Sequence, residues 1–242
     1  MVLNILITGA SRGLGLAIAK QQLELGHSVF VVNRTVSREL GELLQRYKER
    51  AVFVECDLAE PTTIKEAVFD RIFGNDVPIH GFVSNAAVAY DDLVSNLDPA
   101  LVESMFRVNV FAPMVLTKLV IRNMLLHRTD GSMVHVSSIC SHKGFKGLAM
   151  YAATKGAVEA FSKNVAREWG SKGIRSNCVV PGFMETSMSS ALSDADREKI
   201  FSRTSLRAAT SIQSVASTVG YLLSDASSSV TGQEFVVDSG TI

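Results

Sequence analysis

The chain has 242 residues, and its 24 basic side chains balance 24 acidic ones, so the net charge is zero. Such a balance provides no electrostatic field for nucleic acid or for an anionic membrane, and the 47% hydrophobic content excludes extended disorder. The only cysteines are Cys56, Cys140 and Cys178, which form no metal-ligand pattern. They fit free, buried thiols in a reducing compartment.

The first eight residues are apolar, but no basic segment precedes them and they run directly into Gly9. They predict a buried strand rather than a signal peptide. We find no apolar run that approaches the 18 or more residues of a membrane span. We therefore expect a soluble, cytoplasmic protein with no membrane contact.

Short apolar runs typical of buried strands alternate with helical patterns along the whole chain. Seven such strands, each linked to the next through a helix, predict an α/β fold with a doubly wound parallel sheet, the Rossmann fold. No linker divides the chain, so residues 1–242 are expected to form a single dinucleotide-binding and catalytic domain. The strands are predicted at 3–8, 28–33, 51–55, 79–84, 132–137, 174–180 and 234–237, and the helices at about 13–25, 37–48, 62–73, 99–127, 149–169 and 212–223.

The longest irregular stretch runs from Pro181 to about Ser211 and contains Phe183, Met184 and Met188. Long segments of this kind in compact domains are often lids or binding loops. We predict a substrate loop or lid at about 183–210, with a short helix near 194–201. Surface decoration is the alternative interpretation.

A glycine-rich segment, Thr8–Gly15, follows the first predicted strand and opens the first predicted helix. Glycines there permit a tight turn and close backbone approach, so the helix N-terminus can face a pyrophosphate. The spacing is Gly-x-x-x-Gly-x-Gly rather than Gly-x-Gly-x-x-Gly, but the flanking strand and helix are those that the motif requires. The candidate cofactor-binding residues in this loop are Gly9, Ser11, Arg12, Gly13, Leu14 and Gly15.

The second predicted strand ends in Asn33, Arg34 and Thr35, where enzymes that use NAD typically have a carboxylate for the ribose 2′-hydroxyl. Arg34, and Arg12 from the glycine loop, could instead pair with a 2′-phosphate. This pattern favours NADPH, without excluding NADH. Each arginine could alternatively be a solvated surface charge.

Tyr151 and Lys155 are four residues apart in a predicted helix, thirteen residues after Ser138. At this spacing the two side chains lie on one helix face. An ammonium group beside a phenol stabilises the phenolate, so we expect a tyrosine pKa below about 10. A serine hydroxyl from the preceding strand could hold a substrate oxygen against that phenol, which would make a proton-transfer site for a carbonyl or an alcohol.

Taken together, these motifs resemble those of the short-chain dehydrogenase/reductase family over nearly the whole chain. The matching segments are Thr8–Gly15, Cys56-Asp57-Leu58, Ser84-Asn85-Ala86-Ala87, Val108-Asn109-Val110, the Ser138, Tyr151 and Lys155 spacing, Pro181–Thr186, and Thr231–Gly240.

The resemblance implies that Tyr151 is the general acid in reduction and the base in oxidation. Lys155 would hold the nicotinamide ribose and depress the tyrosine pKa, Ser138 would orient the carbonyl, and Asn109 would anchor a water in the proton relay. Ser137 is a rival for the hydroxyl role, but adjacent strand residues face opposite ways and the spacing favours Ser138. The further cofactor-binding residues implied are Asp57, Leu58, Asn85, Ala86, Ala87, Tyr151, Lys155, Pro181, Gly182 and Thr186.

Within the family, the strongest similarity is to 3-oxoacyl-[acyl-carrier-protein] reductases. It implies NADPH-dependent reduction of a ketone, such as a 3-oxoacyl thioester, and a homotetramer formed through helices 99–127 and 149–169. Ser84, Ala87 and Ser239 depart from the family pattern. Ser132 also stands where carrier-protein reductases often have a basic residue, which weakens the case for an acyl carrier protein as partner. Lys172 could retain part of a basic patch.

Two other functions stay open at this point. One is a ketoreductase or dehydrogenase for a sugar or secondary metabolite, because the pocket segments 140–150 and 183–205 mix apolar and basic residues. The other is a non-catalytic nucleotide-binding scaffold on the same fold. The presence of Asn109, Ser138, Tyr151 and Lys155 together argues against the scaffold. We predict no metal site.

Overall fold

The protein is built around a seven-stranded sheet whose order is β3-β2-β1-β4-β5-β6-β7, with every neighbouring pair parallel. A computed structural model describes residues 1–74, 76–185 and 193–242. The doubly wound α/β fold is confirmed. Each strand lies within two residues of its predicted bounds. The strands are β1 (Asn4–Thr8), β2 (Ser28–Asn33), β3 (Ala51–Glu55), β4 (Gly81–Ser84), β5 (Gly131–Val136), β6 (Ile174–Pro181) and β7 (Glu234–Val237).

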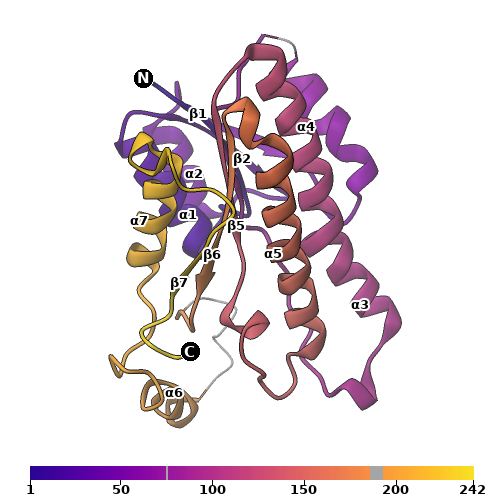
Figure 1. The fold of residues 1–242 in the computed structure, drawn as a ribbon, viewed down its shortest axis with the longest axis vertical. Coiled ribbons are helices and arrows are strands. Elements are labelled where there is room, and N and C mark those ends of the chain that lie inside the picture. The colour runs from indigo at the N-terminus through magenta and orange to yellow at the C-terminus, as the bar shows by residue number, and fades with distance from the viewer. Residues whose placement is uncertain (75, 186–192) are drawn as a thin grey trace.

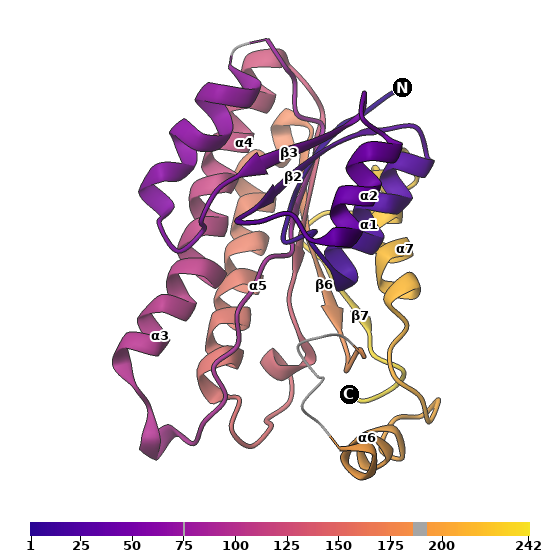
Figure 2. The same cartoon turned by 180° about the vertical axis from the view of Figure 1, so that it is seen from behind.

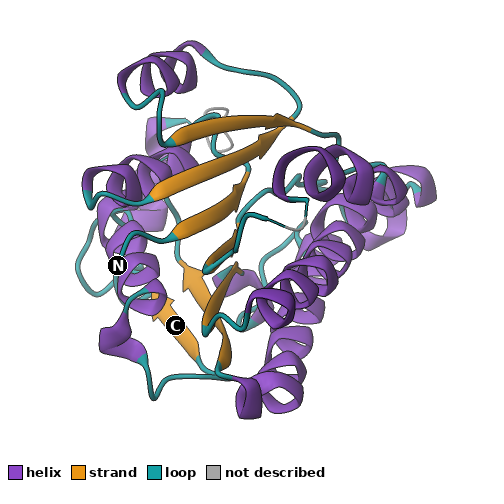
Figure 3. Cartoon of the chain, turned by 90° about the horizontal axis from the view of Figure 1, so that it is seen from above, coloured by secondary structure: helices purple, strands orange, loops and turns teal. Residues whose placement is uncertain are grey.

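Helices cover both faces of the sheet, as expected for strands that are apolar on both sides. Helices α1, α2 and α7 pack on one face, and η2, α4 and α5 pack on the other (Figures 1 and 2). Figure 3 looks onto these layers from above, with the strands between the two sets of helices. The helices are α1 (Gly13–Glu24), α2 (Arg38–Arg46), η1 (Pro61–Thr63), η2 (Lys65–Phe73), η3 (Val94–Asn96), α3 (Pro99–Phe106), η4 (Arg107–Phe111), α4 (Ala112–His127), η5 (Ile139–Ser141), α5 (Ala149–Trp169), η6 (Gly170–Lys172), α6 (Asp194–Phe201), α7 (Ile212–Leu223) and η8 (Asp225–Ser227).

The helix predicted at 99–127 is interrupted by the π-helical turn η4. Proline 113 lies just beyond this turn and has no N–H, so it cannot donate to the carbonyl of Asn109 four residues earlier. By length and composition, Pro99–His127 is the one described helix that could cross a membrane, contrary to our expectation that no such segment exists. In its most apolar window 56% is buried, which is the behaviour of a helix packed on a sheet.

Strands β1 and β4 are neighbours although β2 and β3 lie between them in sequence, so the chain reverses direction across the sheet at this pair. Ligands in doubly wound sheets bind at the carboxyl ends of the strands beside such a switch point. Helix α6 lies near this end of the sheet (Figure 1), within the predicted substrate loop. Thr186 and Met188 fall outside the described residues.

Candidate active site

The loop after β1 leaves no room for larger side chains. Gly9 has a φ of +73°, and a Cβ atom there would lie 2.7 Å from the Cα of Ala86. Thr8 Oγ1 accepts hydrogen bonds from the backbone N–H groups of Asn85 and Ala86, both at 3.1 Å. The amide of Asn85 donates back to the carbonyls of Thr8 and Gly9 at 3.0 Å. The segments after β1 and β4 are thus held together, and glycine is required at the contact.

The N-terminus of α1 is left open by its own sequence. Its N-cap residue, Arg12, makes no side-chain capping hydrogen bond, and no acidic side chain lies in the first turn. Ser37 Oγ, itself the N-cap of α2, donates to the carbonyl of Ser11 at 2.5 Å and fixes the loop from outside. Free N–H groups at a helix start, together with the helix dipole, suit a phosphate group.

Polar groups that have no partner among the described residues follow the carboxyl ends of β1 and β2. Asn33 is buried, yet its side-chain nitrogen has no hydrogen-bond partner among the residues that the structure describes. Within the same described ranges, the exposed guanidinium groups of Arg12 and Arg34 form no ion pair, and Thr35 is exposed beside them. A nucleotide with a 2′-phosphate fits this donor set, because it supplies the missing acceptors.

After β3, Asp57 and Leu58 occupy the next position along the same edge of the sheet. The carboxylate of Asp57 accepts from the N–H of Ala59 at 2.9 Å and remains exposed, whereas Leu58 is buried. Both therefore lie beside the end of β2, as a nucleotide-binding role requires.

Asn109 holds the segment that follows β4. From the π-helical turn, its side-chain oxygen accepts from the N–H of Val88 at 2.9 Å, and its nitrogen donates to the Val88 carbonyl at 2.8 Å. The same nitrogen donates to Thr154 Oγ1 at 3.1 Å. Asn109 is buried and ties this segment to α5, the helix that carries Tyr151.

Tyr151 and Lys155 lie one turn apart near the start of α5, as their spacing predicts. The Lys155 ammonium lies 5.5 Å from the centre of the Tyr151 ring and donates to the carbonyl of Val136, at the end of β5, at 2.9 Å. Lys155 is only 4% exposed. The buried cation is therefore fixed between the tyrosine and the end of the sheet.

The expectation of a lowered tyrosine pKa is wrong. Burial raises the pKa of Tyr151, and the neighbouring Cys140 and Asp91 raise it further. Burial also lowers the pKa of Lys155 to about 8, although Cys178, Cys140 and Glu159 oppose this shift. Desolvation disfavours both charged forms and is the largest cause of both pKa shifts. Tyr151 therefore keeps its proton at neutral pH.

The two serines after β5 face different partners. Ser137 is buried and donates to Glu159 on α5 at 2.6 Å. Ser138 has an extended backbone, and its hydroxyl accepts from the N–H of Cys140 at 3.3 Å. This turn, η5, packs against α5, the helix that carries Tyr151. Ser138 thus remains the candidate hydroxyl.

Beyond β6, Pro181 ends the strand and Gly182 donates to the carbonyl of Val237 at 2.9 Å. A Cβ atom on Gly182 would lie 2.6 Å from the Cα of Asp238, so only glycine fits. Met184 packs against the core on the side of α1 and α7. The residues after β1 to β6 thus converge on one edge of the sheet.

A family model described as enoyl-(acyl carrier protein) reductase matches residues 9–241. The 3-oxoacyl-[acyl-carrier-protein] reductase FabG of Chlamydia pneumoniae is 32% identical over 98% of this chain and 96% of its own length. The chain belongs to the short-chain dehydrogenase/reductase family. It is therefore an NAD(P)-dependent oxidoreductase.

Solved structures of this kind superpose closely on the chain. A gluconate 5-dehydrogenase from Burkholderia cenocepacia, in complex with NADP and tartrate, has a TM-score of 0.92 and 27% identity, covering 99% of this chain and 94% of that one. A 4-hydroxyisoleucine dehydrogenase complexed with NADH has a TM-score of 0.93 and 25% identity, covering 99% and 98%. Relatives of this oxidoreductase thus bind either nicotinamide cofactor.

Several residues around the site were not singled out from the sequence. Thr154 bridges Asn109 and the Tyr151 carbonyl, which it reaches at 2.7 Å. Thr8 joins the glycine loop to the segment after β4. Glu159 follows Lys155 by one helical turn, so the i+4 spacing that identified the lysine could also have identified this buried acid.

Proposed function

We propose that this oxidoreductase uses NADPH to reduce a ketone to a secondary alcohol, with Tyr151 as the general acid. The observation that carries the proposal is the buried Lys155 ammonium beside the Tyr151 ring, at the strand ends next to the glycine loop. Arg12, Arg34 and the Asn33 nitrogen, which have no partner in the described ranges, support NADPH over NADH, because a 2′-phosphate would satisfy them.

The chain's own residues suit the protonation half of this reaction. Bound NADPH would supply the hydride. Tyr151, whose pKa is raised, arrives protonated and gives its proton to the carbonyl oxygen as negative charge develops there. Ser138 donates a hydrogen bond to the same oxygen and orients it. Lys155 holds the nicotinamide ribose and offsets the charge left on the phenolate.

The π-helical turn supports a role for Asn109 in returning the proton. Since Pro113 has no N–H, the Asn109 carbonyl lacks the donor that a regular helix would supply. A water held there could connect Lys155 with solvent. The side chain of Asn109 meanwhile keeps Val88 and Thr154 in place.

The substrate class has two candidates. Similarity to FabG supports a 3-oxoacyl thioester, and Phe145 and Leu148 supply apolar surface just before α5. The similarity to a gluconate 5-dehydrogenase supports a polar hydroxy acid instead. We favour the ketone of an acyl thioester and place the substrate loop at about 183–210.

Delivery by an acyl carrier protein has weaker support. Lys172 lies in η6, just before β6 begins, and therefore at the amino end of the sheet rather than the end that carries Tyr151. A carrier protein bound there would be remote from the active site of the same chain.

We also propose a homotetramer in the cytoplasm. A groove of about 450 Å³ runs between α4 and α5 and is lined by apolar side chains such as Ile121, Phe161 and Trp169. Exposed Phe111 and Leu126 extend this apolar surface. A second copy of the chain would cover it. Light scattering of the purified protein measures the assembly.

Loss of NADPH absorbance, measured with a panel of 3-oxoacyl thioesters, keto sugar acids and simple ketones, tests the proposed function. Tyr151→Phe should lower kcat by roughly a thousandfold, because the proton donor is removed. NADPH binding, followed by fluorescence, should persist. Tyr221→Phe, on α7, is the matched control and should leave kcat unchanged. Turnover retained by Tyr151→Phe would contradict the mechanism.

A further inference from the structure

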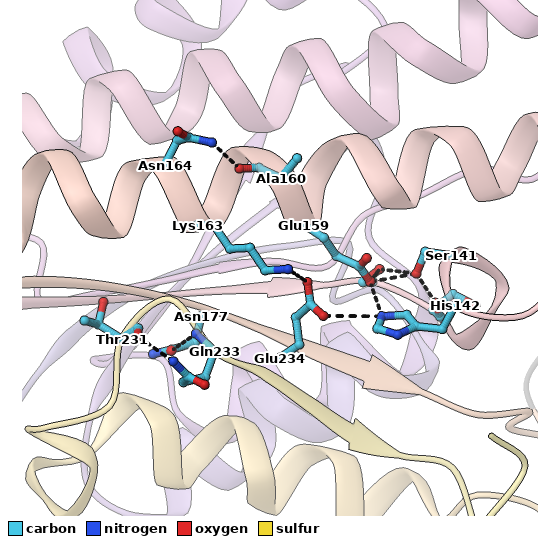
Figure 4. Close-up of polar contacts among 12 residues, drawn as sticks. Ser141, His142, Glu159, Ala160, Lys163, Asn164, Asn177, Thr231, Gln233 and Glu234 are labelled. Carbon is cyan, nitrogen blue, oxygen red and sulfur yellow. Dashed lines mark hydrogen bonds and ion pairs between the residues drawn. The ribbon is translucent and has the colours of Figure 1, made fainter.

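A buried carboxylate, Glu159, lies behind the turn that carries Ser138. One of its oxygens accepts from the hydroxyls of Ser137 and Ser141, each at 2.6 Å, and lies 3.1 Å from His142 Nε2. These three partners flank Ser138 on both sides. Figure 4 shows Glu159 pointing from its helix into this turn.

Glu159 belongs to a stripe along one side of α5. Tyr151, Lys155, Glu159 and Lys163 follow one another at four-residue intervals, so they project from one face of the helix. Helix α5, which carries Tyr151, therefore also contacts, through Glu159, the turn that carries Ser138.

The hydrogen bonds around Glu159 extend to the backbone of Ser138. Ser141 Oγ lies 2.6 Å from the Ser138 carbonyl and 2.6 Å from Glu159, and its single proton can be donated to either of these two oxygens. The partners of the Ser138 side chain within its own turn are the N–H of Cys140, at 3.3 Å, and the Cys140 thiol. The orientation of the serine hydroxyl is thus determined mainly by how its backbone is held.

Nearer the surface, the network continues to Glu234, whose carboxylate lies beside a lysine and a histidine. His142 Nε2 lies 3.6 Å from Glu234, and Lys163 Nζ lies 2.6 Å from the other oxygen of that carboxylate (Figure 4). His142, Glu159 and Glu234 could together ligate a metal ion. Lys163 already pairs with Glu234, and two serine hydroxyls already contact Glu159, so both carboxylates have protein partners without an ion.

We propose that Glu159 is a positioning residue, which sets the Ser138 hydroxyl at the distance from Tyr151 that carbonyl reduction needs. This inference rests on the proposed reductase function. The catalytic groups remain Ser138, Tyr151 and Lys155, and Glu159 acts through the Ser137–His142 turn. Misplacement of one reacting group by about 1 Å can cost on the order of a hundredfold in rate.

A double-mutant cycle with Ser138 tests the proposal. Glu159→Ala should lower kcat about ten- to hundredfold while the KM for NADPH stays within about twofold. Glu159→Gln keeps an oxygen that can accept from both serines, and it should restore most of kcat. In a Ser138→Ala background, Glu159→Ala should cost less than about twofold more, because the group that it positions is already absent.

Ser141→Ala gives the same cycle with a smaller perturbation, in case Glu159→Ala fails to fold. Ser162→Ala is its control, since Ser162 is buried on the same helix and bonds Ser176 at 2.8 Å without touching the turn. It should change stability but not the coupling with Ser138. Additive losses for Ser138→Ala with both Glu159→Ala and Ser141→Ala would overturn the proposal.

Two further outcomes separate this inference from its alternatives. A fall in kcat after EDTA treatment that Zn²⁺ or Mg²⁺ reverses would overturn it in favour of a metal site. If the wild-type protein reduces carbonyl compounds and Ser138→Ala slows it, the proposed function holds even when the cycle is additive. Failure of the positioning role is therefore distinguishable from failure of the reductase function.

Discussion

The loops after β1 and β2 keep polar groups unpaired, whereas the turn after β5 and helix α5 pair most of theirs. Arg12, Arg34 and the Asn33 side-chain nitrogen have no partner within the described part of the chain. On the other side of the switch point, Asn109, Lys155 and Glu159 are buried and hydrogen-bonded.

This difference follows from what each half has to do. The exposed guanidinium groups of Arg12 and Arg34 are tolerated because water solvates them until a phosphate arrives, and they then contribute to affinity. The buried Asn33 nitrogen is the exception. Proton transfer instead requires groups held in one geometry before the substrate binds, which is achieved by burial and by a full set of partners. The catalytic half is therefore expected to be sensitive to pH and the nucleotide half to charge.

The largest effect should come from His135 in the catalytic half. Its ring lies on β5 between the rings of Phe82 and Phe161. Neither ring nitrogen has a partner among the described residues, and burial lowers the pKa of His135 from 6.5 to about 4. The neutral form is then favoured in the folded state. The unfolded chain therefore takes up a proton at this histidine before the folded protein does. The free energy of unfolding is unaffected above pH 6.5 and falls by about 3 kcal/mol as the pH is lowered towards 4.

His135→Phe removes this titration and leaves an aromatic ring between the two phenylalanines. Urea unfolding at several pH values should show that the variant loses less stability than the wild type between pH 7 and pH 4. At pH 7 the variant should be no less stable, since an unpaired buried polar group has been removed. Parallel pH dependence in the two proteins would show that His135 is not buried neutral.

The same contrast explains what the sequence could predict. Thr8–Gly15 and the Tyr151–Lys155 pair are local patterns whose geometry is set by one turn or one helix, so the structure reproduces them. The prediction of a lowered Tyr151 pKa was wrong because desolvation depends on burial in the tertiary structure, which residue spacing does not report. The interruption of helix 99–127 was missed although Pro113 signals it, because the apolar pattern continues across the π-helical turn.

Glu159 was missed for a different reason. Its partners Ser137, Ser141 and His142 come from a turn 17 to 22 residues away, so only the packing of α5 on β5 reveals the network. Thr154 is similar, because its contact with Asn109 joins residues 45 positions apart. A sequence motif can name the groups that react but not the contacts that hold them.

A smaller effect is expected from Arg34, in the nucleotide half. Arg34→Asp should raise the KM for NADPH roughly ten- to hundredfold, because a charged hydrogen bond of about 1.5–3 kcal/mol is replaced by repulsion. The KM for NADH should fall or stay constant, since the new carboxylate can accept from a ribose hydroxyl. Lys20→Asp, an equal charge change at an exposed site on α1, is the control. Unchanged cofactor preference in Arg34→Asp would remove the argument for NADPH.

The smallest effect is expected from Lys155. This residue lies in the catalytic half, but it would also hold the cofactor. Because burial lowers the pKa of Lys155 to about 8, the cation is present below pH 8 and is lost above it. The value of kcat/KM for NADPH reports ionisations of the free enzyme, so it should fall about tenfold per pH unit above this pKa. Direct binding of NADPH to Tyr151→Phe should show the same alkaline limb, which assigns it to the lysine. If the alkaline limb is absent in Tyr151→Phe, the titrating group is Tyr151 instead. The catalytic half would then respond to pH through the Tyr151 phenol rather than through the Lys155 ammonium.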